Sequence, residues 1–170
     1  MARPFIQCPP NAAGQRGAVL IVALVFLLLL TLIGISSMQN ATLQEKMAGS
    51  VATRNTTLQL AESALRVGEK AVAAANFNQA VCASTAACKP PIDTSTVAAP
   101  GNGQNSVVWK GTLADGLYAI QYLGITGTAP VNFDAAEGSS VMLYRITAVG
   151  MNPNNTAVRT VLESIYAKKP

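Results

Sequence analysis

This 170-residue chain contains no histidine, so its cysteines are the residues best suited to covalent or metal-binding chemistry. Without histidine, neither a serine–histidine or cysteine–histidine nucleophilic site nor a histidine-ligated metal site can form. Cys82 and Cys88 enclose five residues in the stretch CASTAAC, whereas Cys8 lies far upstream. In an oxidising compartment, Cys82 and Cys88 can form a disulfide, which would contribute about 2 to 2.5 kcal/mol by the loop-entropy argument. A metal site is the alternative, but two thiols without a second pair offer too few ligands.

The acidic residues are dispersed along the chain. No two of them are spaced as an acid/base pair or within a calcium-binding loop, and no glycine-rich phosphate loop occurs. They are Glu45, Glu62, Glu69, Asp93, Asp115, Asp134, Glu137 and Glu163. The ten basic residues beyond residue 17 are scattered as well, which argues against nucleic-acid binding. We therefore expect no enzyme, no metal, no cofactor and no nucleic-acid partner.

A long apolar block near the N-terminus must hold part of this chain in a membrane. Residues 17–44 carry no charge, and within residues 18–35 only Thr31 and Gly34 interrupt Val, Leu, Ile, Phe and Ala. Eighteen helical residues rise about 27 Å, close to the thickness of a bilayer's hydrocarbon core. Fourteen of them are Leu, Ile, Val or Phe, which favours insertion by about 4 to 8 kcal/mol.

The flanks of the block predict its orientation. Arg3 and Arg16 precede it and no acid does, so the N-terminus is expected to stay cytoplasmic while the rest crosses the membrane. A cleaved secretory signal is the alternative, but the run is longer than a usual signal core and no clear A-x-A site follows.

The helix is expected to continue well past the apolar block. No proline occurs between Pro10 and Pro90. After residue 35 the pattern becomes amphipathic, which predicts one helix over about residues 18–75. Its expected weak points are Gly34, Gly49, Gly68 and the Asn55-Thr56-Thr57 stretch. The predicted apolar stripe comprises Leu58, Ala61, Leu65, Gly68, Val72 and Ala75, flanked by Leu60, Ala64, Val67 and Ala71.

The remainder reads as a loop followed by strands. Residues 76–105 are rich in Ala, Ser, Thr, Pro, Gly and Asn, which is typical of a loop. Alternating β-branched and aromatic residues predict strands at 106–111, 117–124, 140–150 and 156–168, with a loop at 125–139. Arg159 and Glu163 share one face of the last strand, which suggests that this face is partly wet. The five aromatic residues of these strands are expected in the core or on the sheet: Trp109, Tyr118, Tyr122, Tyr144 and Tyr166.

The predicted fold class is α+β, with a long N-terminal helix whose first half spans the membrane. Its second half packs on an antiparallel sheet of about four strands, because that sheet needs a cover on its apolar face.

This organisation resembles a type IV pilin, and most closely a PilX-type minor pilin. The segment RGAVLIVALVFLLLLTLIGISSMQNATLQEKMAG, followed by LQLAESALRVGE, is similar to the PilX N-terminal region. The closing strands, YRITAVG and TAVRTVLESIY, resemble the last two strands of such proteins. The resemblance implies a leader over residues 1–17, cut after Gly17 by prepilin peptidase, and methylation of Ala18. Arg16 would set the topology.

Two features depart from the usual pilin. Most pilins carry a glutamate at the fifth mature position, where this chain has Val22. In the family that acid is understood to pair with a neighbouring subunit's N-terminal amine, so a subunit with valine offers only its own Ala18 amine. PilX-type pilins and the tip pseudopilin of type II secretion are similar in lacking the acid, and both are placed near a filament tip. The cysteines also lie just after the helix instead of near the chain end.

The resemblance implies a minor pilin of the tip and priming complex, which supports pilus assembly, adhesion and twitching motility. The expected segments are the leader at 1–17, the transmembrane half-helix at 18–40, the amphipathic half at 41–76, and the periplasmic loop and sheet region at 77–170. Expected partners are other minor pilins, the major pilin, prepilin peptidase, the inner membrane and a tip adhesin. The alternatives are a pseudopilin of type II secretion and a signal-anchored periplasmic binding protein.

Overall fold

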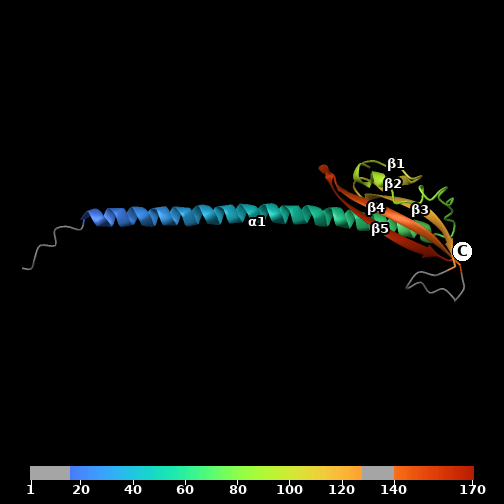
Figure 1. Cartoon of the computed structure of the whole chain (residues 1–170), viewed down its shortest axis with the longest axis horizontal. Coiled ribbons are helices and arrows are strands. Elements are labelled where there is room, and N and C mark those ends of the chain that lie inside the picture. The colour runs from blue at the N-terminus through green and yellow to red at the C-terminus, as the bar shows by residue number, and fades with distance from the viewer. Residues whose placement is uncertain (1–15, 128–139) are drawn as a thin grey trace, which may run out of the picture. The chain divides into compact units, whose positions relative to one another are not determined.

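The computed structural model of the chain describes residues 16–127 and 140–170 (Figure 1). Cys8, nearly all of the predicted leader and most of the predicted loop at 125–139 lie outside the described residues. The chain divides into two compact units, Met1–Ala48 and Gly49–Pro170. The first unit contributes helix alone to the described structure, whereas the second contains the end of that helix and all of the strands.

Helix α1 spans Arg16–Ala73. The three glycines and the Asn55-Thr56-Thr57 stretch, expected as weak points, are α-helical throughout. The hydroxyl of Thr56 donates to the carbonyl of Ala52 at 3.0 Å, so this side chain bonds back within the helix and does not divert the backbone. The helix ends at a turn in which the amide of Phe77 donates to the carbonyl of Ala74 at 3.1 Å.

The buried face of α1 is narrower than predicted and is built from small residues. Its fully buried positions are Thr57, Ala61, Ala64, Gly68 and Val72. Leu58 and Ala75 were wrongly predicted for this stripe, because Leu58 is 37% exposed and Ala75 lies exposed beyond the end of the helix. Val67, predicted to flank the stripe, is 50% exposed. Close approach of the sheet selects small side chains at the centre and leaves the larger ones at the margins.

The sheet contains five strands in the order β1-β2-β3-β4-β5, all pairs antiparallel. The strands are β1 (Gly101–Asn102), β2 (Val108–Thr112), β3 (Gly116–Thr126), β4 (Val141–Asn152) and β5 (Asn155–Lys168). The last four correspond to the predicted strands. The turn between β4 and β5 falls at Pro153 and Asn154.

Strand β1 and the 3-10 helix η1 (Ile92–Ser95) lie in a segment predicted as loop. The two residues of β1 are too few to show a strand pattern, and β1 forms by pairing with β2. Asn105 and Ser106, which connect the two strands, both have φ of 57°. Consecutive positive φ angles are those of a type I′ hairpin turn.

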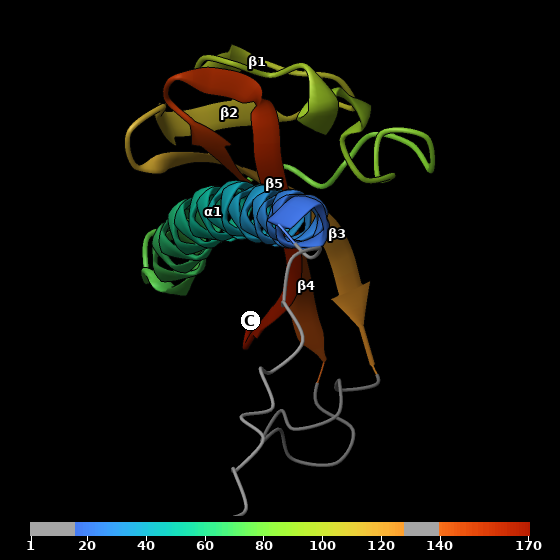
Figure 2. The ribbon, with the colours of Figure 1, turned by 90° about the vertical axis from the view of Figure 1, so that its left-hand side faces the viewer.

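Both faces of the sheet are covered. On one face, Val72 of α1 packs with Ile120, Tyr144 and Ile146 in a buried cluster. On the other face, a second buried cluster has Val97 packed against it. Its members are Val107, Trp109, Leu117, Ala119, Val149 and Met151. Residues 77–107, here called the covering segment, supply Val97 and Val107 to this second core. Figure 2 shows β1, β2 and the green loops of this segment on one side of α1.

Candidate functional site: the apolar helix and the disulfide loop

The first half of α1 presents an uncovered apolar surface. It is the one helix among the described residues that is long and apolar enough to cross a membrane, and its most apolar stretch is entirely exposed. Arg16 and Gly17 lie at its first two positions and Ala18 follows, with no acidic residue in the first turn. Such a surface requires lipid or other helices as its environment. The arrangement therefore fits membrane anchoring.

Val22 lies on this uncovered surface, with 53% of its area exposed. No acidic residue is present in α1 before Glu45, so the apolar stretch has no carboxylate to offer a neighbouring amine. Thr31 is the polar side chain that interrupts this stretch, and its hydroxyl finds a hydrogen-bond partner within the helix, the carbonyl of Leu28 at 2.8 Å. Satisfied polar groups are what a hydrocarbon environment demands.

Cys82 and Cys88 form the predicted disulfide, with 5.3 Å between their Cα atoms. The amide of Cys82 donates to the carbonyl of Tyr122 in β3 at 3.0 Å. The carbonyl of Cys88 accepts a hydrogen bond from Arg145 Nη1 of β4. Arg145 is held in turn by Glu163 of β5 in a salt bridge of 2.9 Å. The disulfide loop is therefore fastened at both cysteines to the sheet.

Gln121 is the second anchor of the covering segment, and it was not predicted. Its side chain is buried, and Nε2 lies 2.7, 3.0 and 3.2 Å from the carbonyl oxygens of Ala87, Lys89 and Asn105. Its Oε1 accepts from Arg145 Nη1 at 3.4 Å. The sequence indicated that this glutamine would be buried, because it shares the inward-facing positions of a predicted strand with Leu and Ala. A buried glutamine side chain must find hydrogen-bond partners.

The far end of the covering segment is tied down by Asp93 and Arg159. Trp109 Nε1 donates to Asp93 Oδ2 at 3.0 Å. Arg159 Nη1 donates to the carbonyls of Thr94 and Val97 at 3.1 and 3.0 Å. The face of β5 that the sequence predicted to be wet is thus partly covered, and its charges hold the covering segment.

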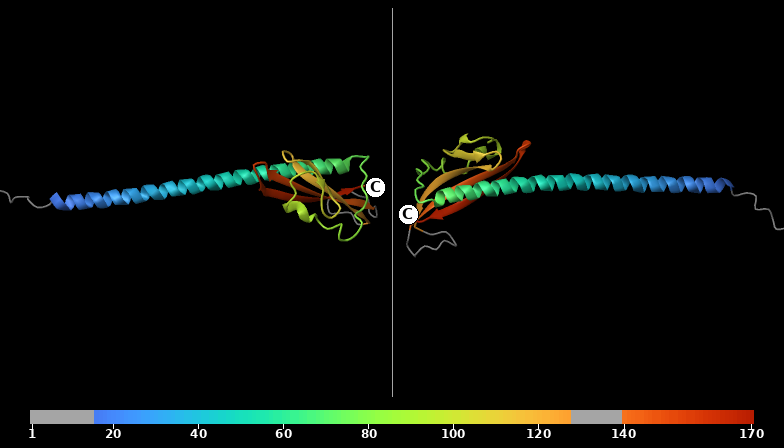
Figure 3. Two further views of the ribbon diagram at one scale, coloured as in Figure 1. Left: turned by 90° about the horizontal axis from the view of Figure 1, so that it is seen from above. Right: turned by 180° about the vertical axis from the view of Figure 1, so that it is seen from behind.

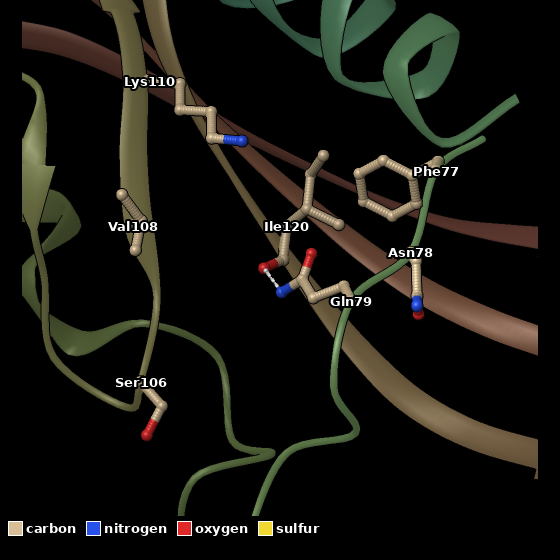
Figure 4. Close-up of a pocket in the computed structure, with 7 residues that line it drawn as sticks. All are labelled: Phe77, Asn78, Gln79, Ser106, Val108, Lys110 and Ile120. Carbon is tan, nitrogen blue, oxygen red and sulfur yellow. Dashed lines mark hydrogen bonds between the residues drawn. The ribbon is translucent and has the colours of Figure 1, made fainter. Parts of the chain in front are cut away.

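An open pocket of about 270 Å³ lies where β2 separates from β3 (Figure 4). Strand β2 pairs with β3 only from Lys110 to Thr112, so beyond this the edge of β3 needs other partners. The side chain of Gln79 supplies one, since its Nε2 donates to the carbonyl of Ile120 at 2.7 Å. Lys110 is the only ionisable residue among those lining the pocket. The lining residues therefore offer no acid/base pair and no cluster of metal ligands.

The aromatic residues pack, as predicted, in the core and on the sheet. Trp109 and Tyr144 are buried. The rings of Tyr122 and Tyr144 stack with centroids 4.7 Å apart, and Phe77 meets Tyr144 edge-on at 5.6 Å. Burial, together with the nearby Tyr122, raises the pKa of Tyr144 above the ordinary tyrosine value. This raised pKa follows from core packing and does not mark a reactive site.

The arrangement of helix and sheet defines the class of protein. A long apolar N-terminal helix packed on a five-stranded antiparallel sheet is an α+β, pilin-like fold. Residues 16–66 match the family model described as PilX N-terminal, so the chain carries a PilX-type type IV pilin N-terminus. The match supports a pilin associated with the type IV pilus. No curated protein and no solved structure matches the chain.

Proposed function

We propose that this protein is a minor pilin of the tip and priming complex of a type IV pilus. The observation that carries the proposal is the uncovered apolar helix with Val22 in place of the usual glutamate. Prepilin peptidase cuts after Gly17, and Ala18 becomes the methylated N-terminus. The half-helix at 18–40 waits in the inner membrane and then becomes filament core, where helices of other pilins replace its lipid contacts.

Valine at position 22 restricts where the subunit fits in a filament. A carboxylate at mid-bilayer costs about 2.5 to 3.5 kcal/mol, a cost offset by pairing with a neighbour's amine. A subunit with Val22 cannot provide that carboxylate, although its Ala18 amine can still meet an acid on another subunit. One-sided pairing suits the end of a filament, where one side has no partner.

The remaining segments of the chain also have roles in this pilus subunit. Segment 1–17 is the leader that stays cytoplasmic, with Arg16 setting the topology, and residues 41–76 together with 77–170 form the periplasmic head. The head is carried outward with the pilus, where the subunit contacts other minor pilins, the major pilin and a tip adhesin. In this position it supports assembly, adhesion and twitching motility.

The tip position is tested by restoring the acid. We expect wild-type protein, detected by immunogold on sheared pili, at filament ends, and Val22→Glu protein along filament shafts as well. Val25→Glu is the matched control, since it places the same carboxylate on the same uncovered helix but off the fifth position. Shaft labelling by wild-type protein, or by both variants equally, would contradict the proposal.

Processing is tested separately by mass spectrometry of the mature N-terminus. We expect a methylated N-terminus at Ala18, and replacing Gly17 by a bulky residue should block both cleavage and piliation. Retention of Met1, or a cut beyond Ile35, would exclude a pilin. Deleting the gene and scoring twitching against exoprotein release distinguishes a pilus role from one in type II secretion.

A further inference from the structure

Three hydrogen bonds that involve side chains connect α1 to the last strand. The hydroxyls of Thr57 and Thr160 lie 2.8 Å apart. Ser164 Oγ donates to Glu69 Oε1 at 2.8 Å, and Lys168 Nζ donates to the carbonyl of Ala74 at 2.7 Å. Ala74 directly follows the end of α1, so the three bonds are distributed from the first buried turn of the helix to its C-terminus.

The three bonds show that α1 and β5 run in the same direction, as Figure 3 illustrates. Residue numbers rise together on both elements, from Thr57 with Thr160 to Ala74 with Lys168. Seventeen helical steps cover about 26 Å at 1.5 Å each. Eight strand steps cover about 26 Å at 3.3 Å each. Because the two lengths agree, both terminal bonds can form at once, and the even spacing keeps all three β5 residues on one face.

Close packing fixes the helix along this path. A Cβ atom added to Gly150 of β4 would collide with the carbonyl oxygen of Thr57 and the amide nitrogen of Ala61. A Cβ atom added to Gly68 would lie 2.6 Å from Ile146 Cγ2. Backbone this close to backbone leaves no room for one element to slide past the other. A shift of one helical turn, about 5.4 Å, would also break all three hydrogen bonds.

We propose that α1 and β5 form a shear clamp, made of Thr57, Glu69 and Ala74 on the helix side and Thr160, Ser164 and Lys168 on the strand side. It carries tension between the helix and the head. The clamp rests on the proposed function, because a subunit held in a filament by its helix must transmit any pull on its head through this joint. A force between the N-terminal end of α1 and the C-terminal end of β5 loads all three bonds together.

The test is to pull the full-length protein in detergent with optical tweezers, using handles at its two termini. The clamp variants are Thr160→Val, Ser164→Ala and Lys168→Met. Forced unfolding is governed by the unfolding rate, so each lost bond should raise that rate under load about fivefold, the equivalent of one net hydrogen bond. Thr147→Val and Lys169→Met are the matched controls and should not raise that rate. The Thr147 hydroxyl is buried and has no hydrogen-bond partner among the described residues, and Lys169 is exposed at the chain end.

A second pulling geometry separates a clamp from general stabilisation. In a Cys8→Ser, Asn154→Cys double variant, one handle is attached to the new cysteine, directly before β5. This handle and the N-terminal handle then pull on the same end of the clamp. The bonds then break one after another, and we expect unfolding at a lower force than between the termini. Equal forces in the two geometries, or clamp variants that behave like their controls, would overturn the clamp. Neither result depends on piliation, which the N-terminal mass spectrum addresses independently.

Discussion

Gly150→Ala should be among the most damaging single-methyl changes in the head, because Gly150 touches the backbone of α1. Its Cβ atom would meet the carbonyl of Thr57 and the amide of Ala61, and it would lie 3.0 Å from Leu60 Cβ. Helix backbone cannot move aside as a flexible side chain can. The whole buried stripe must therefore lift away from the sheet or the strand must bend.

The expected loss is about 3 kcal/mol in the free energy of unfolding. Overpacking a close-packed core costs roughly 1 to 3 kcal/mol. Separating the helix from the sheet by even 0.5 to 1 Å forfeits a quarter to a half of each dispersion contact along the stripe. Against a total of roughly 6 to 18 kcal/mol for about 120 residues, the variant should fold, with its Tm lowered by about 10 °C.

Urea unfolding of the full chain in detergent measures this loss, with fluorescence of the single tryptophan, the buried Trp109, as the probe. Gly49→Ala is the matched control: nothing lies within 4 Å of the added methyl, and removing a helical glycine should stabilise α1 by up to about 1 kcal/mol. A loss below 1 kcal/mol for Gly150→Ala at an unchanged m-value, or an equal loss for Gly49→Ala, would refute the close-approach argument.

Three further predictions concern the head. Ser106→Gly should stabilise it by about 0.5 to 1 kcal/mol in the same urea assay, because Ser106 has φ of 57° in a type I′ turn; a loss would contradict this reading. Replacing Cys82 and Cys88 together by serine should cost about 2 to 2.5 kcal/mol and increase amide exchange in the covering segment; unchanged exchange there would show that its other anchors suffice. The raised pKa of Tyr144 predicts that stability falls as pH rises above about 10, where unfolded tyrosine loses its proton while folded Tyr144 retains it. Tyr144→Phe should flatten that fall in a pH series of thermal melts, and an unaltered alkaline slope would assign it to other groups.

Local patterns in the sequence were enough for the elements and for the class of protein. An uncharged run of apolar residues predicts a membrane-competent helix because length and hydropathy are local properties. The absence of proline allowed the helix to be extended to its true end within two residues. Alternation predicted β2 to β5. The two cysteines, six positions apart in a segment expected to be exported, predicted the disulfide that they form.

The register between elements could not be predicted in this way. Leu58 and Val67 carry the hydrophobic signal of the helix, yet both are exposed, whereas Thr57, which lay outside the predicted stripe, is fully buried. Which residues lie at the centre depends on how closely the sheet approaches, and Gly150 of a distant strand sets that distance. The carbonyl partners of Gln121 and Arg145 in the covering segment were equally hidden, because backbone carbonyls carry no residue-type signal.

The sequence by itself thus determined that the chain has a pilin-type helix, a disulfide and an antiparallel sheet, since each follows from neighbouring residues. Only the tertiary structure decided how they are joined. The small buried residues of α1 pack on β4, hydrogen bonds connect α1 to β5, and Gln121, Arg145 and Arg159 hold the covering segment. Those contacts join residues up to about a hundred positions apart, and their geometry exists only once the backbone of the sheet has met the backbone of the helix.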